Sequence, residues 1–446
     1  MAKRMGRLPL GTGPLAFGRL VFSAAIVVIV ALDISTLALV LSAHGLGGPV
    51  FRNAYAAAVL VGGGHNPYAS QAILHELERI APNSGFSANF PLFPYLPWYP
   101  IVIWPLTLVP FQSAYEIWVV AAVVMVAWSA RAWLRWCGFR SRQWMILVPL
   151  LVAAPVEEVV HYGETSALVL AGMTVSFALF QRRNWMAVGA VAVVVAALKP
   201  QDAVWLPAGY LLLALVSDRK SWGKYTGGLL LGLAAVVLLP LAVNIHLWLS
   251  WWENFHRFAA AIGHSQQDVA GVVGIERWLP NGGIGTVSLH DPTVWAVGGL
   301  GVVALVAWLW RAITTPGWVH ADPVDRWIAL VAVPATLIMA FGPYFHTYDL
   351  LAWVPLLLWG LVRQPRSLKW MITWLILAGL EVTRVVQYII PFPDRTLGST
   401  TPLFVSGLVV LVGAWLGMAE GRLRAIPLAG TDIPTEPGPT TLRATS

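Results

Sequence analysis

The sequence predicts an all-α fold, that of a polytopic integral membrane protein with about twelve transmembrane helices. Of its 446 residues, 58% are hydrophobic and only 11% carry a charge, and the mean hydropathy is +0.70. A soluble core could not absorb so many apolar side chains. The chain also contains 24 Trp, a residue that gathers at membrane–water boundaries. The composition therefore indicates a protein that lies largely within lipid.

Crossing a bilayer takes about 20 apolar helical residues, and roughly thirteen segments approach that length. They are 15–43, 95–111, 114–136, 143–160, 164–181, 184–199, 201–217, 225–249, 291–310, 326–343, 347–362, 367–391 and 400–419. The segment 95–111 carries four prolines, each of which removes or strains a helical hydrogen bond. We expect this segment to be a short or re-entrant helix.

The basic residues indicate how the spans are oriented, because positively charged loops resist translocation. About twenty of the 28 Lys and Arg fall in connections that would share one face. They are Lys3, Arg4, Arg7, Arg19, Arg131, Arg135, Arg140, Arg142, Arg182, Arg183, Arg219, Lys220, Lys224, Arg311, Arg326, Arg363, Arg366, Lys369, Arg422 and Arg424. We expect this face, with both termini, to be cytoplasmic in a plasma membrane. Anionic lipid opposite it accounts for the net charge of +7 without a nucleic-acid partner.

A single transmembrane domain is predicted over residues 1–425. Its first apolar run is too long for a cleaved signal peptide and follows a basic N-terminus, so we expect a retained anchor. Residues 426–446 are rich in Pro, Thr and Gly and are expected to form a disordered cytoplasmic tail. The lone cysteine, Cys137, excludes an intramolecular disulfide framework and a thiolate metal cluster.

The face opposite the basic one is expected to carry two long outer loops, at 44–94 and 250–290. The first predicts two helices lying along the interface, near 51–61 and 69–80, because three consecutive glycines at 62–64 interrupt the apolar pattern. Long ordered loops are often functional, so this face is the place to look for a site.

Polar side chains also gather where predicted spans end on this outer face. They are Glu158, His161 and Glu164; Lys199, Gln201 and Asp202; His264, Gln267 and Arg277; and His346, Tyr348 and Asp349. Alternating spans return these clusters to one depth, which predicts a cavity that opens outward. The histidine spacings match no metal-ligand pattern, so neither a metal nor another cofactor is expected.

Charges are also predicted deeper in the membrane. Asp33 lies in the first span, and Glu381 and Arg384 lie three residues apart inside 367–391. A charge in hydrocarbon is costly and usually pairs or lines a cavity, which makes each of the three a functional candidate. Glu381 and Arg384 could equally form a structural pair on one helix face.

Six stretches occur in an order that resembles a known family. They are FRNAYAAAVLVGGGHNPY, FPLFPYLPWYPIVIWPLTLVPF, HYGETSALVLAG, AVVVAALKPQDAVWLP, GHSQQDVAGVV and FHTYDLLAWVPLLL. Over roughly residues 15–420 the chain is similar to the membrane glycosyltransferases of family 87. These are enzymes of the GT-C architecture, and the likeness is to polyprenol-phosphate-mannose-dependent alpha-1,2-mannosyltransferases.

The resemblance implies a reaction at the outer face. A polyprenyl-phosphate-linked sugar would be the donor, and a glycolipid or glycan in the membrane would be the acceptor. A carboxylate would remove the proton of the acceptor hydroxyl, and cationic or amide groups would hold the phosphate. Lys199 is favoured for the phosphate, with Gln201, Arg277 and Arg384 as further ligands, and Tyr68, His264, Gln267 and His346 are expected to bind substrate.

The carboxylate that the family carries in its first outer loop is absent from this chain. The matching position is Val50, with Phe51, Arg52 and Asn53 beside it. Four other acids are alternative bases: Asp33, Glu158, Glu164 and Asp349. Two further readings stay open, a lipid or polysaccharide transporter or flippase, and a relative that binds a lipid-linked sugar without transferring it. A transporter should show inverted repeats and paired broken helices, and no repeat is evident.

Overall fold

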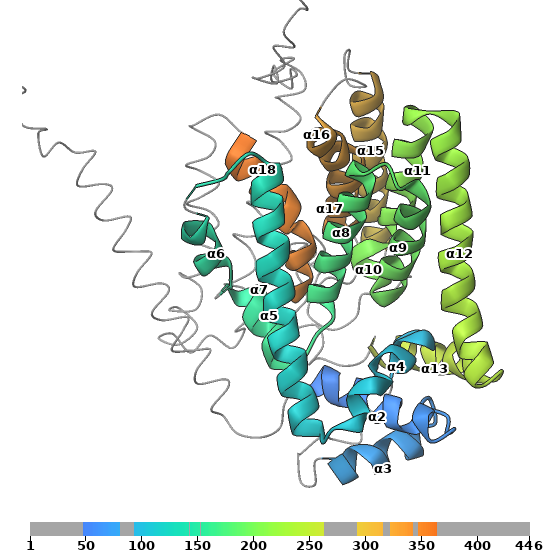
Figure 1. The fold of residues 1–446 in the computed structure, drawn as a ribbon. Coiled ribbons are helices and arrows are strands. Elements are labelled where there is room, and N and C mark those ends of the chain that lie inside the picture. The colour runs from blue at the N-terminus through green and yellow to red at the C-terminus, as the bar shows by residue number, and fades with distance from the viewer. Residues whose placement is uncertain are drawn as a thin grey trace, which may run out of the picture.

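The computed structural model describes residues 48–80, 93–141, 143–151, 153–262, 292–314, 322–341 and 347–363. Every element in these ranges is a helix and none is a strand, which confirms the all-α class. Helices stand side by side as a bundle, and four of them close one end (Figure 1). These four are α2 (Pro49–Gly62), α3 (Ser70–Ile80), α4 (Trp98–Ile103) and α13 (Leu247–Ile262). We call this the loop end.

Three helical stretches of the described chain are long and apolar enough to cross a membrane. They are α5 (Phe111–Trp136), α12 (Arg219–Val243) and the run Pro323–Phe341, which joins α16 (Pro323–Trp327), the π-helical η4 (Ile328–Ala332) and α17 (Val333–Phe341). A fourth span is possible if α7 (Ala154–Tyr162) and α8 (Ser166–Gln181), bent by 119°, count together. The expected twelve spans are therefore not confirmed.

Several predicted spans are divided into shorter helices. Segment 143–160 contains two helices, α6 (Trp144–Leu151) and α7. Segment 201–217 contains most of the short α10 (Pro200–Ala203) and then α11 (Trp205–Ser217). Segment 347–362 contains the 3-10 helix η5 (Thr347–Trp353) and then α18 (Val354–Arg363). Proline explains the first of these divisions, since Pro155 stands in the first turn of α7. Pro200, in the first turn of α10, separates that helix from the one before it. The helix α9 (Trp185–Leu198) lies within the predicted span 184–199. It has 14 residues and is about 21 Å long, which is shorter than the roughly 30 Å hydrocarbon layer of a bilayer.

The described part of the predicted first outer loop, residues 48–80, folds close to its prediction. The helices expected at 51–61 and 69–80 are α2 and α3, and the glycines at 62–64 separate them. Segment 95–111 holds only α4 and the 3-10 helix η1 (Trp104–Leu108) before α5 begins. Residues 250–262, expected as loop, belong to the helix α13. Its aromatic residues Trp248, Trp251, Trp252 and Phe255 recur at helical spacing and so lie on one side of the helix.

Glycines allow α9 and α12 to pack with their backbones in contact. A Cβ on Gly228 would overlap the carbonyl of Met186, and one on Gly232 would lie 2.7 Å from the carbonyl of Ala190. Close approach of this kind through small residues is typical of helix pairs in membranes. It places the end of α9, where Lys199 follows, at a fixed position in the bundle.

Indole groups satisfy the backbone where the run Pro323–Phe341 departs from α-helical geometry. Pro334 has no N–H to donate to the carbonyl of Leu330 four residues earlier. Trp205 Nε1 donates to that carbonyl at 2.8 Å, and Trp308 Nε1, from α15 (Pro292–Thr314), donates to the carbonyl of Ala329 at 2.7 Å. The π-helical turn is therefore supplied with hydrogen bonds from neighbouring helices.

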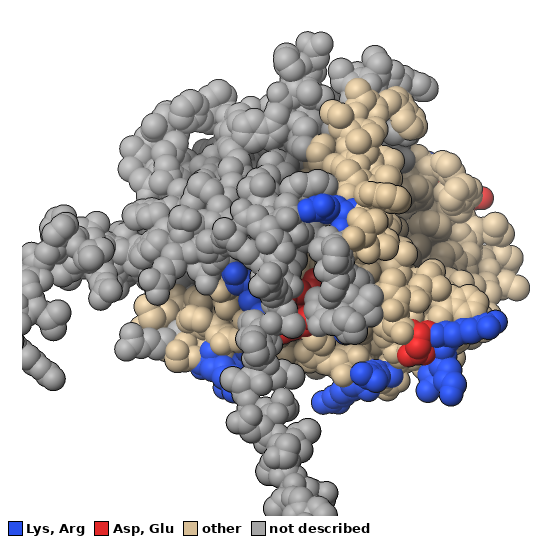
Figure 2. Space-filling view, turned by 90° about the horizontal axis from the view of Figure 1, so that it is seen from above, with Lys and Arg blue, Asp and Glu red and all other residues tan. Residues whose placement is uncertain are grey.

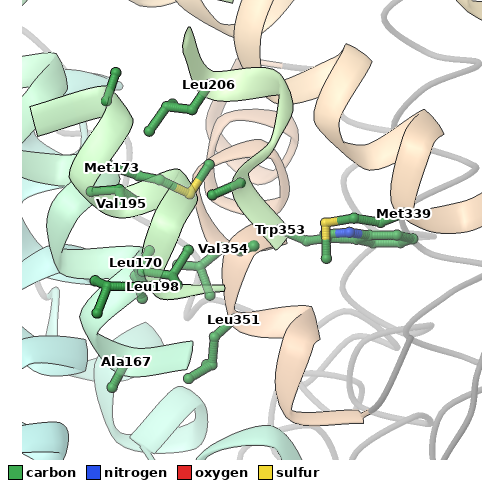
Figure 3. Packing of buried hydrophobic residues seen from close by; sticks show 14 of the residues in the cluster. Ala167, Leu170, Met173, Val195, Leu198, Leu206, Met339, Leu351, Trp353 and Val354 are labelled. Carbon is green, nitrogen blue, oxygen red and sulfur yellow. The ribbon is translucent and has the colours of Figure 1, made fainter. Parts of the chain in front are cut away.

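Apolar packing surrounds the ends of α8 and α9. Leu170 and Met173 of α8 lie near Val195 and Leu198 of α9, and Leu351 of η5 lies beside them (Figure 3). All five are buried. Water therefore has little access to the polar side chains carried at these helix ends.

The end of the bundle opposite the loop end is basic. Its exposed residues include Arg182 and Arg183 after α8, and Arg219, Lys220 and Lys224 at the start of α12. Figure 2 views the molecule from this end and shows Lys and Arg side chains around the described surface. We call this the basic end.

Candidate active site

Near the loop end, one buried lysine meets three carboxylates. Lys199 Nζ lies 2.5 Å from Asp349 Oδ1, 3.2 Å from Glu164 Oε2 and 3.8 Å from Asp202 Oδ2. It also donates a hydrogen bond to Ser166 Oγ at 2.9 Å. All five residues are buried. We call them the Lys199 cluster; it holds more acidic than basic groups.

Proline places Lys199 inside the protein. Lys199 ends α9 in an extended conformation, with φ −151° and ψ 87°, and Pro200 begins α10. A residue before proline is disfavoured in the α conformation, so the helix ends here and the lysine leaves the helical path. The turn closes because the Asp202 N–H donates to the Lys199 carbonyl at 3.1 Å. Lys199 and Asp202 are thereby held together.

A left-handed glycine presents Glu164. Gly163 ends α7 with φ 69° and ψ 38°, a conformation that other residues adopt with strain. A Cβ at this position would also overlap Phe51 of α2. Two side chains of α5 hold the turn, since Trp118 Nε1 donates to the Gly163 carbonyl at 3.1 Å and Tyr115 Oη to the Val160 carbonyl at 2.5 Å.

The contacts of Glu164 fall on one of its two oxygens. Oε2 accepts hydrogen bonds from Lys199 Nζ and the Thr165 N–H, both at 3.2 Å, and from Tyr95 Oη at 3.4 Å. No described residue contributes a hydrogen bond to Oε1. The carboxylate is therefore oriented by three donors while one oxygen stays available to a ligand.

Asp349 is more enclosed than Glu164. Its Oδ1 contacts Lys199 and accepts a hydrogen bond from Ser166 Oγ at 3.3 Å, and its side chain has no exposed surface. The 3-10 helix η5 carries Asp349 against α7 and α8. These contacts suit a residue that fixes Lys199 and Ser166 in place.

Tyrosines connect the cluster to the segment that follows α2. Tyr68, which follows α2, donates its hydroxyl to the carbonyl of Tyr95 at 2.8 Å, and Tyr95 reaches Glu164. Burial raises the pKa of the Tyr68 hydroxyl well above its ordinary value, so the group stays protonated and acts as a donor. The Tyr95 and Tyr99 rings pack with centroids 4.7 Å apart.

The structure brings together three residues that the sequence placed in separate motifs: Glu164, Lys199 and Asp349. Tyr68 joins them through Tyr95. Gln201 and Glu158 are half-buried, and neither is among the residues in contact with Lys199. Six predicted site residues lie outside the described ranges: Asp33, His264, Gln267, Arg277, His346 and Arg384.

Two members of the site, Ser166 and Tyr95, were not predicted, and Asp202 was predicted in the cluster with Lys199 but without a role of its own. Asp202 lies three residues after Lys199, on the same turn, and that spacing was the available signal. Ser166 belongs to the same GETS stretch as Glu164. Tyr95 had no signal in the sequence, because its link to Glu164 depends on tertiary packing across 69 residues.

The position expected for the family's first-loop carboxylate lies in α2. Phe51 is fully buried there and stacks on Trp118 with ring centroids 5.2 Å apart. Arg52 is buried as well, and burial lowers the pKa of its guanidinium. Packing occupies this part of α2, which agrees with a base that comes from another element.

The fold and the site together define an all-helical protein with membrane-length helices and a buried, predominantly acidic cluster near one end of its bundle. Within this class, the family model described as Glycosyltransferase family 87 matches residues 93–340, and the chain belongs to that family. The match includes Glu164, Lys199 and Asp202, whereas α2, α3 and Asp349 lie outside it. Comparisons with curated proteins and with solved structures found no match.

Proposed function

We propose that this glycosyltransferase takes a sugar from a polyprenyl-phosphate donor, mannose by family resemblance, and transfers it to a lipid or glycan acceptor at the outer membrane face. Glu164 is the proposed general base. The observation that carries this assignment is the one-sided coordination of Glu164, with Oε2 held by three donors and Oε1 without a hydrogen bond from the described residues.

In the proposed reaction, Glu164 Oε1 removes the proton of the acceptor hydroxyl as that oxygen attacks the anomeric carbon of the sugar. The new glycosidic bond forms while the bond from the anomeric carbon to the phosphate oxygen breaks. The electron pair of that bond leaves with the polyprenyl phosphate. Each step needs the carboxylate to be ionised before the reaction begins.

Lys199 has a different role in this proposal from the phosphate ligand expected at the outset. Its ammonium group already contacts Asp349, Glu164 and Ser166. A phosphate would add negative charge to a cluster in which acids already outnumber the single lysine, and close like charges in a dry site are costly. We therefore assign Lys199 to orienting the Glu164 carboxylate through its contact with Oε2. The phosphate falls to the other predicted ligands, chiefly Arg277 and Arg384.

Family membership and the buried cluster both support a transferase over the transporter and flippase readings. A catalytic carboxylate needs a fixed orientation within hydrogen-bonding reach of its proton, and Glu164 has that orientation.

Turnover by the purified full-length chain tests the proposal. The probe is a polyprenyl-phosphate carrying radiolabelled mannose, offered with a membrane lipid extract, and the readout is a labelled glycolipid on thin-layer chromatography. Glu164→Gln should reduce product at least about 100-fold, since it removes the base and keeps the side chain's shape. Lys199→Ala should abolish product as well. Glu158→Gln is the matched control and should retain turnover.

Two results would overturn the assignment. If Glu164→Gln turns over at the rate of the unaltered chain, the base is another residue. If the unaltered chain forms no product from polyprenyl-phosphate mannose, glucose or arabinose, the chain is a non-catalytic relative or uses a different donor class. Binding of the same labelled donor would then distinguish these two.

A further inference from the structure

The structure has the helix α13 where the sequence predicted an outer loop, and part of the surface of this helix is apolar and exposed. Leu249, Trp252 and Phe255 are exposed along one edge, by 65%, 54% and 39%. Glu253 and Arg257 are exposed beside them. At 100° per residue, Trp252 and Phe255 share one side of the helix, and Glu253 and Arg257 lie about 100–160° around the axis from them. Leu249 and the exposed His256 lie between these two groups.

The apolar edge of α13 continues the apolar surface of α12. The last turns of α12 expose Leu238, Leu239 and Val243, and Ile245 in the connection is exposed as well. Only 22% of the most apolar stretch of α12 is buried within the protein, as expected of a helix that faces lipid. The apolar surface therefore continues from a membrane-length helix to α13, with Asn244 and His246 as the polar residues of the connection.

Other side chains of α13 fix the helix to the protein. Asn254 is buried and its amide donates to the Phe93 carbonyl at 2.8 Å, and Trp251 Nε1 donates to the Pro94 carbonyl at 3.1 Å. The Asn66 amide donates to Ser250 Oγ at 3.0 Å. Trp248 Nε1 donates back to Val237 of α12 at 3.1 Å. With these four contacts in place, α13 cannot rotate to bury Trp252 and Phe255.

We propose that α13 is a membrane-surface helix, with Leu249, Trp252 and Phe255 in the lipid and Glu253 and Arg257 in the water of the headgroup layer. An amphipathic helix with Trp and Phe on one side and charges on the other lies in this position at a bilayer boundary. Its partner is the bilayer itself. Continuity with the exposed surface of α12 is the observation that selects lipid over a protein partner.

The position has a consequence for the Lys199 cluster. The carbonyls of Phe93 and Pro94 accept hydrogen bonds from α13, and the next residue, Tyr95, contacts Glu164. The plane of the membrane surface therefore runs close to the cluster. That the Lys199 cluster acts on lipid-borne substrates rests on the proposed function. The location of α13 at the membrane surface does not.

Spin labels on the full-length chain in phosphatidylcholine–phosphatidylglycerol nanodiscs test the location. Cys137 is buried, so the native background serves for Trp252→Cys and Phe255→Cys, with Glu253→Cys and Arg257→Cys as matched controls on the same helix. The first pair should collide more with oxygen, which concentrates in lipid, and the second pair more with a water-soluble nickel chelate. The depth parameters of the two pairs should have opposite signs.

Two patterns would overturn the inference. Preference for nickel at all four positions would place the whole helix in water. Shielding of Trp252→Cys and Phe255→Cys from both reagents would mean that protein, a second copy or another segment, covers the edge. Because collision rates need no turnover, either failure is distinct from failure of the transferase assignment. Size-exclusion profiles confirm that the labelled chains are folded.

Discussion

Asp349 and Asp202 both contact the Lys199 ammonium, yet at distances of 2.5 and 3.8 Å that give them different weights. The shorter contact comes from a carboxylate that also accepts the hydroxyl of Ser166. The longer one comes from the neighbouring turn of the chain, and it adds a third acid to a cluster with one cation. The two aspartates therefore predict opposite responses to neutralisation.

Asp349→Asn should destabilise the fold strongly, because it removes the nearest partner of a buried ammonium. Breaking a buried ion pair on one side typically costs about 3–5 kcal/mol. Asp202→Asn should leave the melting temperature unchanged or raise it, since it removes surplus negative charge. Thermal unfolding of both variants in the same detergent provides the measurement. Equal losses would show that the two carboxylates contribute alike.

The sequence identified Glu164, Lys199 and Asp349 as candidates because each stands at the end of an apolar segment. A charged side chain is costly there unless it pairs or lines a cavity. The sequence did not identify Ser166 and Tyr95. A serine at a helix start is common for local reasons, and a tyrosine near an interface is common in membrane proteins. Only tertiary packing separates these two from ordinary instances of their kind.

At the scale of elements, the contact between α9 and α12 depends on which glycine faces the neighbouring helix. Gly228→Ala should force the helices apart, because its Cβ would overlap the Met186 carbonyl. Gly227→Ala is the matched control: the nearest atom to its Cβ is the flexible end of Met186 at 3.8 Å. Alanine is also favoured over glycine within a helix by about 1 kcal/mol.

Melting temperatures should therefore fall for Gly228→Ala and stay level or rise for Gly227→Ala. Loss of turnover should accompany the first substitution, since α9 carries Lys199 at its end. A fall of similar size in both variants would mean that α12 is sensitive to any added methyl group, and the close contact with α9 would not be its cause.

Helix breaks limited how far the elements could be predicted. Hydropathy registers apolar residues whether or not they form one helix, so 143–160 and 347–362 were expected as single spans. The structure divides each of them. Conversely, α13 was expected as loop because its charges and aromatic residues lower its hydropathy, although their helical spacing is amphipathic. Periodicity would have been the better guide in that segment.

For the whole molecule, the separation of the loop end from the basic end predicts a fixed orientation in the membrane. Exposed Gln71 lies on α3, and exposed Lys220 lies near the start of α12. A membrane-impermeant maleimide applied to intact cells should label Gln71→Cys and should label Lys220→Cys only after permeabilisation. The reverse pattern would place the Lys199 cluster near the cytoplasm and remove an outer-leaflet donor from consideration.

Trp205 and Trp308 donate hydrogen bonds to backbone carbonyls, so the tryptophan content of this chain is not explained by the membrane boundaries alone. An aromatic belt explains indoles at the two boundaries of a bilayer, but these two serve a helix whose own ladder is interrupted. Proline and indole thus form an interdependent pair. In a relative with another residue in place of Pro334, the backbone N–H of that residue can donate to the carbonyl of Leu330, and Trp205 is not needed for this bond. In a chain that has Pro334, the donor to the Leu330 carbonyl must come from a neighbouring helix.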